Sequence, residues 1–190
     1  MSYFLIIISA IFVNNIVLAQ FLGICPFLGV SKRISTGIGM TGAVTFVMVI
    51  ATIVTWLVQD LILIPFGITY LQTISFILII ASLVQLVEIV LKKVSPPLYQ
   101  ALGVFLPLIT TNCAILGVAI MTVSKEFNIL EAVVFSTASA VGFGLALITF
   151  AGIREQLDLM KIPKGMQGAP IALVVAGILA LAFMGFAGMV

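Results

Sequence analysis

The chain has 190 residues, of which 63% are hydrophobic and only 7% are charged, and its mean hydropathy is +1.41. A soluble domain of this size could not expose such a composition to water, so the sequence predicts an all-α integral membrane protein. The formal net charge is only +2 and no basic stripe is present, which argues against a nucleic-acid partner. Histidine is absent, which excludes histidine-ligated haem and histidine-based zinc or copper sites within this chain.

Six stretches are apolar enough to cross a bilayer core, which requires roughly 20 residues of helix. We expect no removable signal peptide, because no basic segment precedes the first stretch. Short loops leave no room for a second domain, so residues 1–190 are expected to form a single membrane domain. The expected spans are 3–30, 37–59, 68–91, 99–123, 130–153 and 169–190.

The two cysteines head the same six-residue pattern. Cys25-Pro-Phe-Leu-Gly-Val lies in the first expected span, and Cys113-Ala-Ile-Leu-Gly-Val lies in the fourth. Equivalent positions three spans apart indicate an internal repeat, with one copy over about 1–95 and the other over about 96–190. An odd number of spans per copy inverts the second copy. We therefore expect two inverted three-helix repeats, related by a pseudo-two-fold axis in the membrane plane.

The first and fourth spans are expected to be interrupted near the cysteines. The first is too long for one straight crossing, and it contains residues that can break a helix. Freed backbone groups would be tolerated there if they face protein or a cofactor rather than lipid. The expected breaking residues are Gly23, Pro26 and Gly29 in the first span and Pro107 and Gly117 in the fourth.

The residues alone leave three roles open for the thiols of Cys25 and Cys113. Each thiol could be a small buried apolar group, or the pair could form a disulfide, although a chain without a secretion signal has little reason to be oxidised. Metal ligation is the third role, and the repeat favours it because symmetry-related thiols beside helix breaks can converge. Two thiolates cannot complete a four-sulfur iron–sulfur site, so such a site would require ligands from a partner.

Further polar groups lie within the spans. Glu88 precedes Lys92 by four residues, which suits either an ion-binding role or an ordinary ion pair near the membrane boundary. The spans that carry the cysteines also carry amides and hydroxyls, which we expect to face inward, either near a cofactor or ion route or as bonds between helices: Asn14, Asn15, Gln20, Thr110, Thr111 and Asn112. Glycines in the spans are interpreted as points of close helix packing: Gly37, Gly39, Gly42, Gly142, Gly144, Gly185 and Gly188.

Three segments carry a family resemblance that covers essentially the whole chain. They are FVNNIVLAQFLGICPFLGVSK around Cys25, LPLITTNCAILGVA around Cys113, and the ending IALVVAGILALAFMGFAGMV. They resemble the family that contains the A subunit of the Rnf complex. The chain is less closely similar to the E subunit of the sodium-pumping NADH:quinone reductase, and the Asn14-Asn15 pair and the Cys-Pro-Phe order favour the Rnf type.

The resemblance implies a subunit of a bacterial or archaeal membrane complex that passes electrons between ferredoxin and NAD and couples this to Na⁺ or H⁺ translocation. It implies that Cys25 and Cys113 are two of the four ligands of a [2Fe-2S] cluster shared with a homologous E-type subunit, alongside subunits B, C, D and G. We expect no haem, flavin or NAD in this chain, which lacks a glycine-rich dinucleotide fingerprint and a complete active site of its own. The coupling ion stays open, with Asn14, Asn15, Asn112 and Glu88 as the candidate ion-pathway residues.

Two other functions fit the same pattern. Many secondary transporters and channels also combine inverted repeats with broken helices. A scaffolding helix bundle with incidental thiols is the third possibility. The paired cysteines favour the electron-transfer function, because transport of a solute does not require thiols.

The distribution of basic residues predicts the orientation, since short cytoplasmic loops are enriched in lysine and arginine. Seven of the eight lie on odd-numbered loops, with only Lys125 opposite: Lys32, Arg33, Lys92, Lys93, Arg154, Lys161 and Lys164. Both termini should therefore lie on the outer face of the cell membrane. A reporter that works only in the cytoplasm should be silent when fused after Val190 and active when fused after Lys93. The reverse result would contradict this topology.

Overall fold

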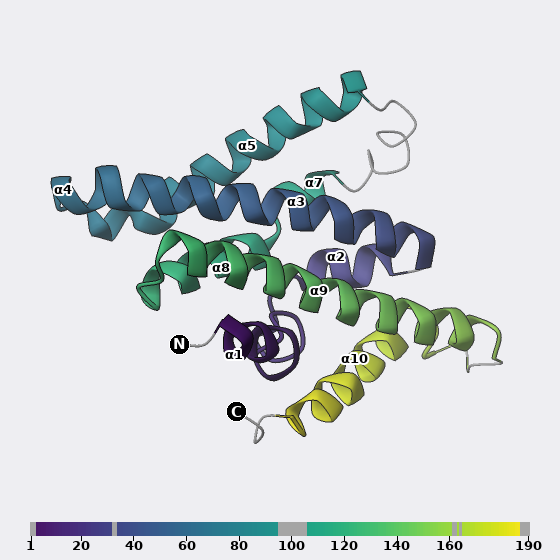
Figure 1. Cartoon of the computed structure of the whole chain (residues 1–190). Coiled ribbons are helices and arrows are strands. Elements are labelled where there is room, and N and C mark those ends of the chain that lie inside the picture. The colour runs from purple at the N-terminus through teal and green to yellow at the C-terminus, as the bar shows by residue number, and fades with distance from the viewer. Residues whose placement is uncertain (1–2, 32–33, 95–105, 161–162, 164, 187–190) are drawn as a thin grey trace.

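The computed structural model describes residues 3–31, 34–94, 106–160, 163 and 165–186. Regular structure in these ranges is entirely helical, as predicted (Figure 1). The elements are α1 (Tyr3–Ile8), a π-helical turn η1 (Ser9–Val13), α2 (Ile24–Val30), α3 (Ile34–Val58), a second π-helical turn η2 (Gln59–Leu63), α4 (Ile64–Phe66), a 3₁₀ turn η3 (Thr69–Leu71), α5 (Gln72–Val94), α7 (Leu106–Thr110), α8 (Cys113–Ser124), α9 (Ile129–Asp158) and α10 (Ala169–Met184).

Helices α3 and α9 form the central pair against which the other elements pack (Figure 1). Small residues bring the two helices together, because lipid supplies no hydrophobic force between helices and close backbone approach replaces it. A Cβ added at Gly144 would collide with the side chain of Thr41, and one at Gly37 would touch Leu147. Gly142 likewise lies against the backbone of Ala10 and Ile11.

These contacts confirm the packing interpretation for Gly37, Gly142 and Gly144. Within the described part of this chain such packing is not found at Gly42, which has no atom within 4 Å of its Cβ position, or at Gly185, whose nearest atom is the carbonyl oxygen of Ala182 in the preceding helical turn, so the packing of these two glycines with other subunits stays a prediction. Gly188 lies outside the described residues.

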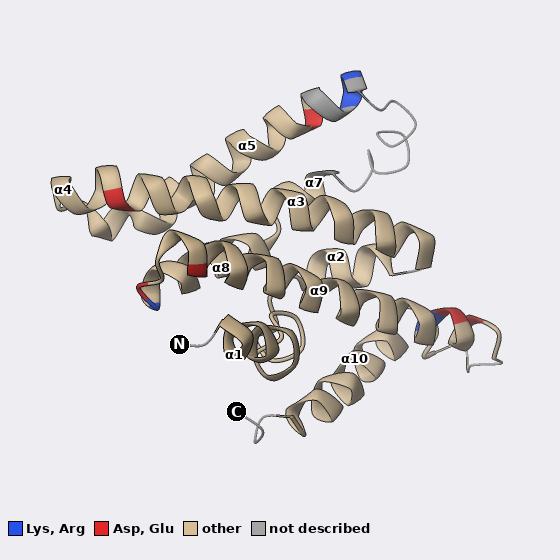
Figure 2. Ribbon diagram, viewed as in Figure 1, with Lys and Arg blue, Asp and Glu red and all other residues tan. Residues whose placement is uncertain are grey.

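Four helical segments are long and apolar enough to cross a membrane in the described part of the chain: Ile34–Phe66, Thr69–Ile89, Pro107–Ser124 and Ile129–Asp158. Their charged residues gather near helix ends (Figure 2). The first and last expected spans form the shorter apolar helices Tyr3–Val13 and Ala169–Met184, so six crossings stay a prediction. The rings of Phe12 and Phe186 lie 5.9 Å apart, which places the ends of these two helices beside each other.

Two expected loops are helical instead. The segment 60–66 continues α3 through η2 and α4, and the π-helical turn η2 immediately precedes α4, whose Pro65 has no N–H to donate to the preceding turn. The chain turns only at Gly67, which has a φ of +67°. Helix α9 begins at a capping box formed by Asn128 and Glu131 and extends to Asp158, so Arg154 lies inside this helix.

Both cysteine-bearing segments are interrupted, as predicted, but four of the five residues expected to break them do not do so. Residues 14–23 are irregular between η1 and α2, and Thr111 and Asn112 separate α7 from α8. Pro26 lies in the first turn of α2 and Pro107 is the second residue of α7, both positions that a helix tolerates. Gly29 and Gly117 lie within α2 and α8, and only Gly23 stands at a break.

Replacing Gly144 with alanine tests the α3–α9 contact. The hydroxyl of Thr41 donates to the carbonyl oxygen of Gly37 at 2.8 Å, which holds its rotamer, so the added methyl must push the helices apart. We expect a loss of about 1–3 kcal/mol, seen as a lower thermal unfolding midpoint in detergent. Gly152→Ala is the matched control, because Gly152 has no neighbour within 4 Å. Adding Thr41→Ala should restore stability, and equal effects at positions 144 and 152 would contradict this account.

Candidate functional site

The two interrupted segments meet at Gly23 and Cys113. The backbone N–H of Gly23 donates a hydrogen bond to Sγ of Cys113 at 2.9 Å. Gly23 has a φ of +81°, and a Cβ there would lie 3.0 Å from the Cβ of Ala114 and 3.3 Å from Oδ1 of Asn112. Glycine is required here both by the left-handed backbone and by the lack of space. Residues 90 positions apart are therefore joined at a thiol.

Asn15 organises the first break. Its side chain is fully buried. Nδ2 donates to the carbonyl oxygens of Ile11 at 3.0 Å and Gly142 at 2.9 Å, while Oδ1 accepts the N–H groups of Val17 at 3.1 Å and Leu18 at 3.3 Å. One amide thus replaces several helical hydrogen bonds that the break removes, and it ties the break to α9.

Asn112 has the corresponding position in the second break. It is the N-cap of α8, and its Oδ1 accepts the N–H of Ala114 at 3.0 Å, which fixes the first turn of the helix that carries Cys113. Its Nδ2 is buried and has no hydrogen-bond partner among the described residues. A buried donor without a partner is costly, so this atom calls for an acceptor that is not part of the described chain.

The two glycines of the shared cysteine pattern contact the opposite half of the chain. The Cβ position of Gly29 lies 3.4 Å from Cδ1 of Leu108, and that of Gly117 would collide with the side chain of Leu22. Each glycine therefore packs against a leucine side chain of the other interrupted segment. The role of these two glycines is this close contact, and neither of them breaks a helix.

Cys25 and Cys113 are both free thiols, with Cys25 exposed and Cys113 half-buried. The free thiols argue against the disulfide, and the exposure of Cys25 argues against a small buried apolar group at that position. Cys113 accepts the hydrogen bond from Gly23, and Cys25 lies two residues after Gly23 in the sequence. Within the described ranges, no cluster of three or more histidine, cysteine, aspartate or glutamate side chains is arranged to hold a metal ion.

The remaining polar residues divide into two groups. Asn15 and Asn112 are buried as expected, and Thr110 is half-buried. The inward-facing prediction is wrong within this chain for three residues that are exposed on its surface: Asn14, Gln20 and Thr111. Glu88 is half-buried near the end of α5, and its ion-binding role stays a prediction.

Arg154 is a positioning residue that the sequence analysis missed. Its Nη1 donates to the carbonyl oxygen of Leu28 at 2.9 Å and to Oγ of Ser31 at 2.8 Å, which caps the end of α2. The rings of Phe27 and Phe150 stack at 4.3 Å beside it. A seven-residue helix is not stable by itself, so these contacts with α9 hold the helix that carries Cys25.

Adjacent asparagines provide a test of the first break. Asn15→Leu keeps a similar volume but leaves the carbonyl of Gly142 and the N–H groups of Val17 and Leu18 without their partner. We expect a loss of about 2–4 kcal/mol, measured as a lower thermal unfolding midpoint in detergent. Asn14→Leu is the control, since Asn14 is exposed and bonds only the hydroxyl of Ser9. A similar loss in both variants would show that Asn15 has no special role.

Similarity to known proteins extends over the whole chain. Residues 3–190 match the family described as Rnf-Nqr subunit, membrane protein. The chain is 59% identical to the A subunit of the Na⁺-translocating ferredoxin:NAD⁺ oxidoreductase complex of Acetobacterium woodii, over 100% of this chain and 98% of the relative. It is 58% identical to the A subunit of the ion-translocating oxidoreductase complex of Syntrophotalea carbinolica, over 98% and 96%, and 50% identical to that of Edwardsiella ictaluri, over 100% and 98%. This chain therefore belongs to the Rnf-Nqr family of membrane subunits.

Proposed function

We propose that this chain is a membrane subunit of an ion-translocating ferredoxin:NAD oxidoreductase complex, and that Cys25 and Cys113 supply half of the ligands of a [2Fe-2S] cluster shared with a homologous subunit. The observation that carries the proposal is the hydrogen bond from Gly23 N–H to Cys113 Sγ, which unites two helix breaks at a thiol. The names of the relatives from Acetobacterium woodii and Syntrophotalea carbinolica support the complex.

The residues present fit a cysteine-ligated cluster. Thiolates are the usual protein ligands of iron–sulfur clusters, and N–H groups that donate to the sulfur stabilise its negative charge. Gly23 provides one such N–H, and the unpartnered Nδ2 of Asn112 is a further donor one residue before Cys113. When bound, the cluster supplies one-electron transfer. This chain holds it through two thiols, while Gly23 orients Cys113 and Asn112 fixes the helix that carries it.

A partner with the same architecture completes the ligand set. Cys25 is exposed on this chain, so a second chain can approach it. The equivalent glycines Gly29 and Gly117 each contact a leucine of the other interrupted segment, Leu108 and Leu22, which supports related packing in the two halves, although the two leucines lie at different distances from their cysteines. A homologous subunit would present its own pair of cysteines in the same way and bring the thiolates to four.

Coupling to Na⁺ or H⁺ would use these same breaks. Half-helices that end inside a membrane expose backbone dipoles to ions, and they are the elements that rearrange in alternating-access proteins. The breaks would equally suit a secondary transporter that has incidental thiols. Iron at the cysteines is the property that separates the two functions.

Cysteine replacement in the assembled complex tests the proposal. Cys25→Ser and Cys113→Ser preserve volume but exchange a soft sulfur ligand for a hard oxygen. We expect each variant to assemble and to lose both the spin-resonance signal of the reduced cluster and the electron flow from ferredoxin to NAD. The losses should be non-additive, because removing one ligand disables the whole shared site. The chain expressed alone should insert without retaining iron, and co-expression with its homologous partner should restore it.

Thr111→Ser is the matched control, since Thr111 is exposed, lies two residues before Cys113, and donates only to the carbonyl oxygen of Pro107. This variant should keep the signal and the activity. A complete cluster in the lone chain, or a serine variant at position 25 or 113 that retains iron and activity, would overturn the shared-ligand proposal.

A further inference from the structure

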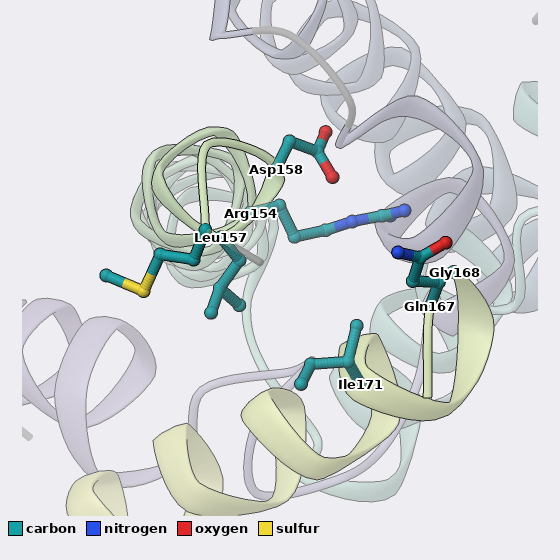
Figure 3. Close-up of a pocket in the computed structure, with 7 residues that line it drawn as sticks. Arg154, Leu157, Asp158, Gln167, Gly168 and Ile171 are labelled. Carbon is teal, nitrogen blue, oxygen red and sulfur yellow. The ribbon is translucent and has the colours of Figure 1, made fainter. Parts of the chain in front are cut away.

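A polar hollow of about 290 Å³ lies between the end of α9 and the start of α10 (Figure 3), and neither cysteine is among its lining residues. Charged residues gather at this end of α9, which marks the boundary between membrane and water (Figure 2). The proposed electron-transfer function does not use this hollow. Its lining includes Arg154, Leu157, Asp158, Gln167, Gly168 and Ile171.

The hollow presents one positive and one negative group. Arg154 extends from α9 into the space beside Gln167, and the carboxylate of Asp158 lies on the same side of α9 (Figure 3). Only Nη1 of Arg154 has hydrogen bonds to described residues, to Leu28 and Ser31, so the remaining guanidinium N–H groups can bind an anion. No hydrogen bond or ion pair is found for the carboxylate of Asp158 within the described part of the chain.

A second, apolar hollow of about 130 Å³ lies between residues 17–28 and α10. The two are adjacent at α2, because the carbonyl of Leu28 binds Arg154 while Leu28 itself lines the apolar hollow. Phe21 and Gly177 are among the residues that line the apolar hollow. A charged end at the boundary and an apolar end in the membrane match an amphiphile.

We propose that this pair of hollows binds a zwitterionic phospholipid whose head group carries a phosphate and a primary ammonium, as phosphatidylethanolamine does. The phosphate binds the free N–H groups of Arg154, the ammonium binds Asp158, and an acyl chain lies in the groove between α2 and α10. The carboxylate of Asp158 would repel a purely anionic head group, and the apolar groove would gain nothing from a soluble ion. The bound lipid would join α10 to the helix that carries Cys25.

Substitution of Asp158 tests whether its carboxylate pairs with the ammonium of the lipid head group. The complex is purified through a tag on this chain from membranes with equal phosphatidylethanolamine and phosphatidylglycerol, and the retained lipids are counted by native mass spectrometry. The unmodified protein should enrich phosphatidylethanolamine roughly two- to fivefold, the range for an exposed ion pair such as that of Asp158. Asp158→Asn should abolish the enrichment, and Asp158→Lys should reverse it. Glu155→Gln is the control, because Glu155 lies on the same helix end but does not line the hollow.

A second variant tests the groove without touching the charges. Gly177→Leu fills the apolar hollow, where nothing lies within 4 Å of the glycine Cβ position, and it should lower the number of retained lipids while leaving any remaining head-group preference unchanged. Gly152→Leu on α9 is its control, since Gly152 is equally open and lines neither hollow. Absence of retained lipid in the unmodified protein, equal head-group ratios in it and in Asp158→Asn, or equal losses at positions 177 and 152 would overturn the proposal.

Discussion

Inside a bilayer, every backbone N–H and C=O group released by a helix break must find a partner within the protein, because no water is present to bind it. This constraint governs the interrupted segments. Asn15 bonds three backbone groups beside the first break and the carbonyl of Gly142 in α9, and Asn112 caps the helix after the second break. The N–H of buried Gly23 donates to the sulfur of Cys113. The candidate site is thus a consequence of how the breaks are satisfied.

The sequence was sufficient for the class of fold and for the existence of two interrupted segments, whereas the convergence of Cys25 and Cys113 on one metal site stays a prediction. Hydropathy identifies apolar stretches regardless of their detailed geometry, and a duplicated pattern with the only two cysteines of the chain is hard to miss. The residues at which the helices break could not be predicted from the sequence in the same way. The sequence alone does not show whether a proline starts a helix or breaks one, or whether a glycine packs within a helix or ends it. Only tertiary contacts distinguish these cases.

The roles of individual polar residues also depend on contacts between distant segments. Nothing in the sequence distinguishes Asn14 from Asn15, yet only the second reaches Gly142 across 127 positions. Arg154 was expected in a loop because it is charged, whereas its bonds to Leu28 and Ser31 draw it into a longer helix. Long-range hydrogen bonds of this kind determine where the side chains of the candidate site lie. A local sequence pattern does not predict such bonds.

The two halves of the chain share a pattern but not the same local structure, and the difference bears on how a cluster could be shared. The first break spans residues 14–23 and leaves Cys25 exposed as the second residue of α2, whereas the second break is confined to Thr111 and Asn112 and leaves Cys113 half-buried as the first residue of α8. The longer break gives α2 no helical continuity with α1, so its position depends on Arg154, the Phe27–Phe150 stack and the packing of Gly29. Cys113 is instead fixed within its own chain by Gly23 and by the cap of α8. One thiol is therefore anchored internally by contacts with its own chain, while the other lies at the surface, where a second subunit can approach it.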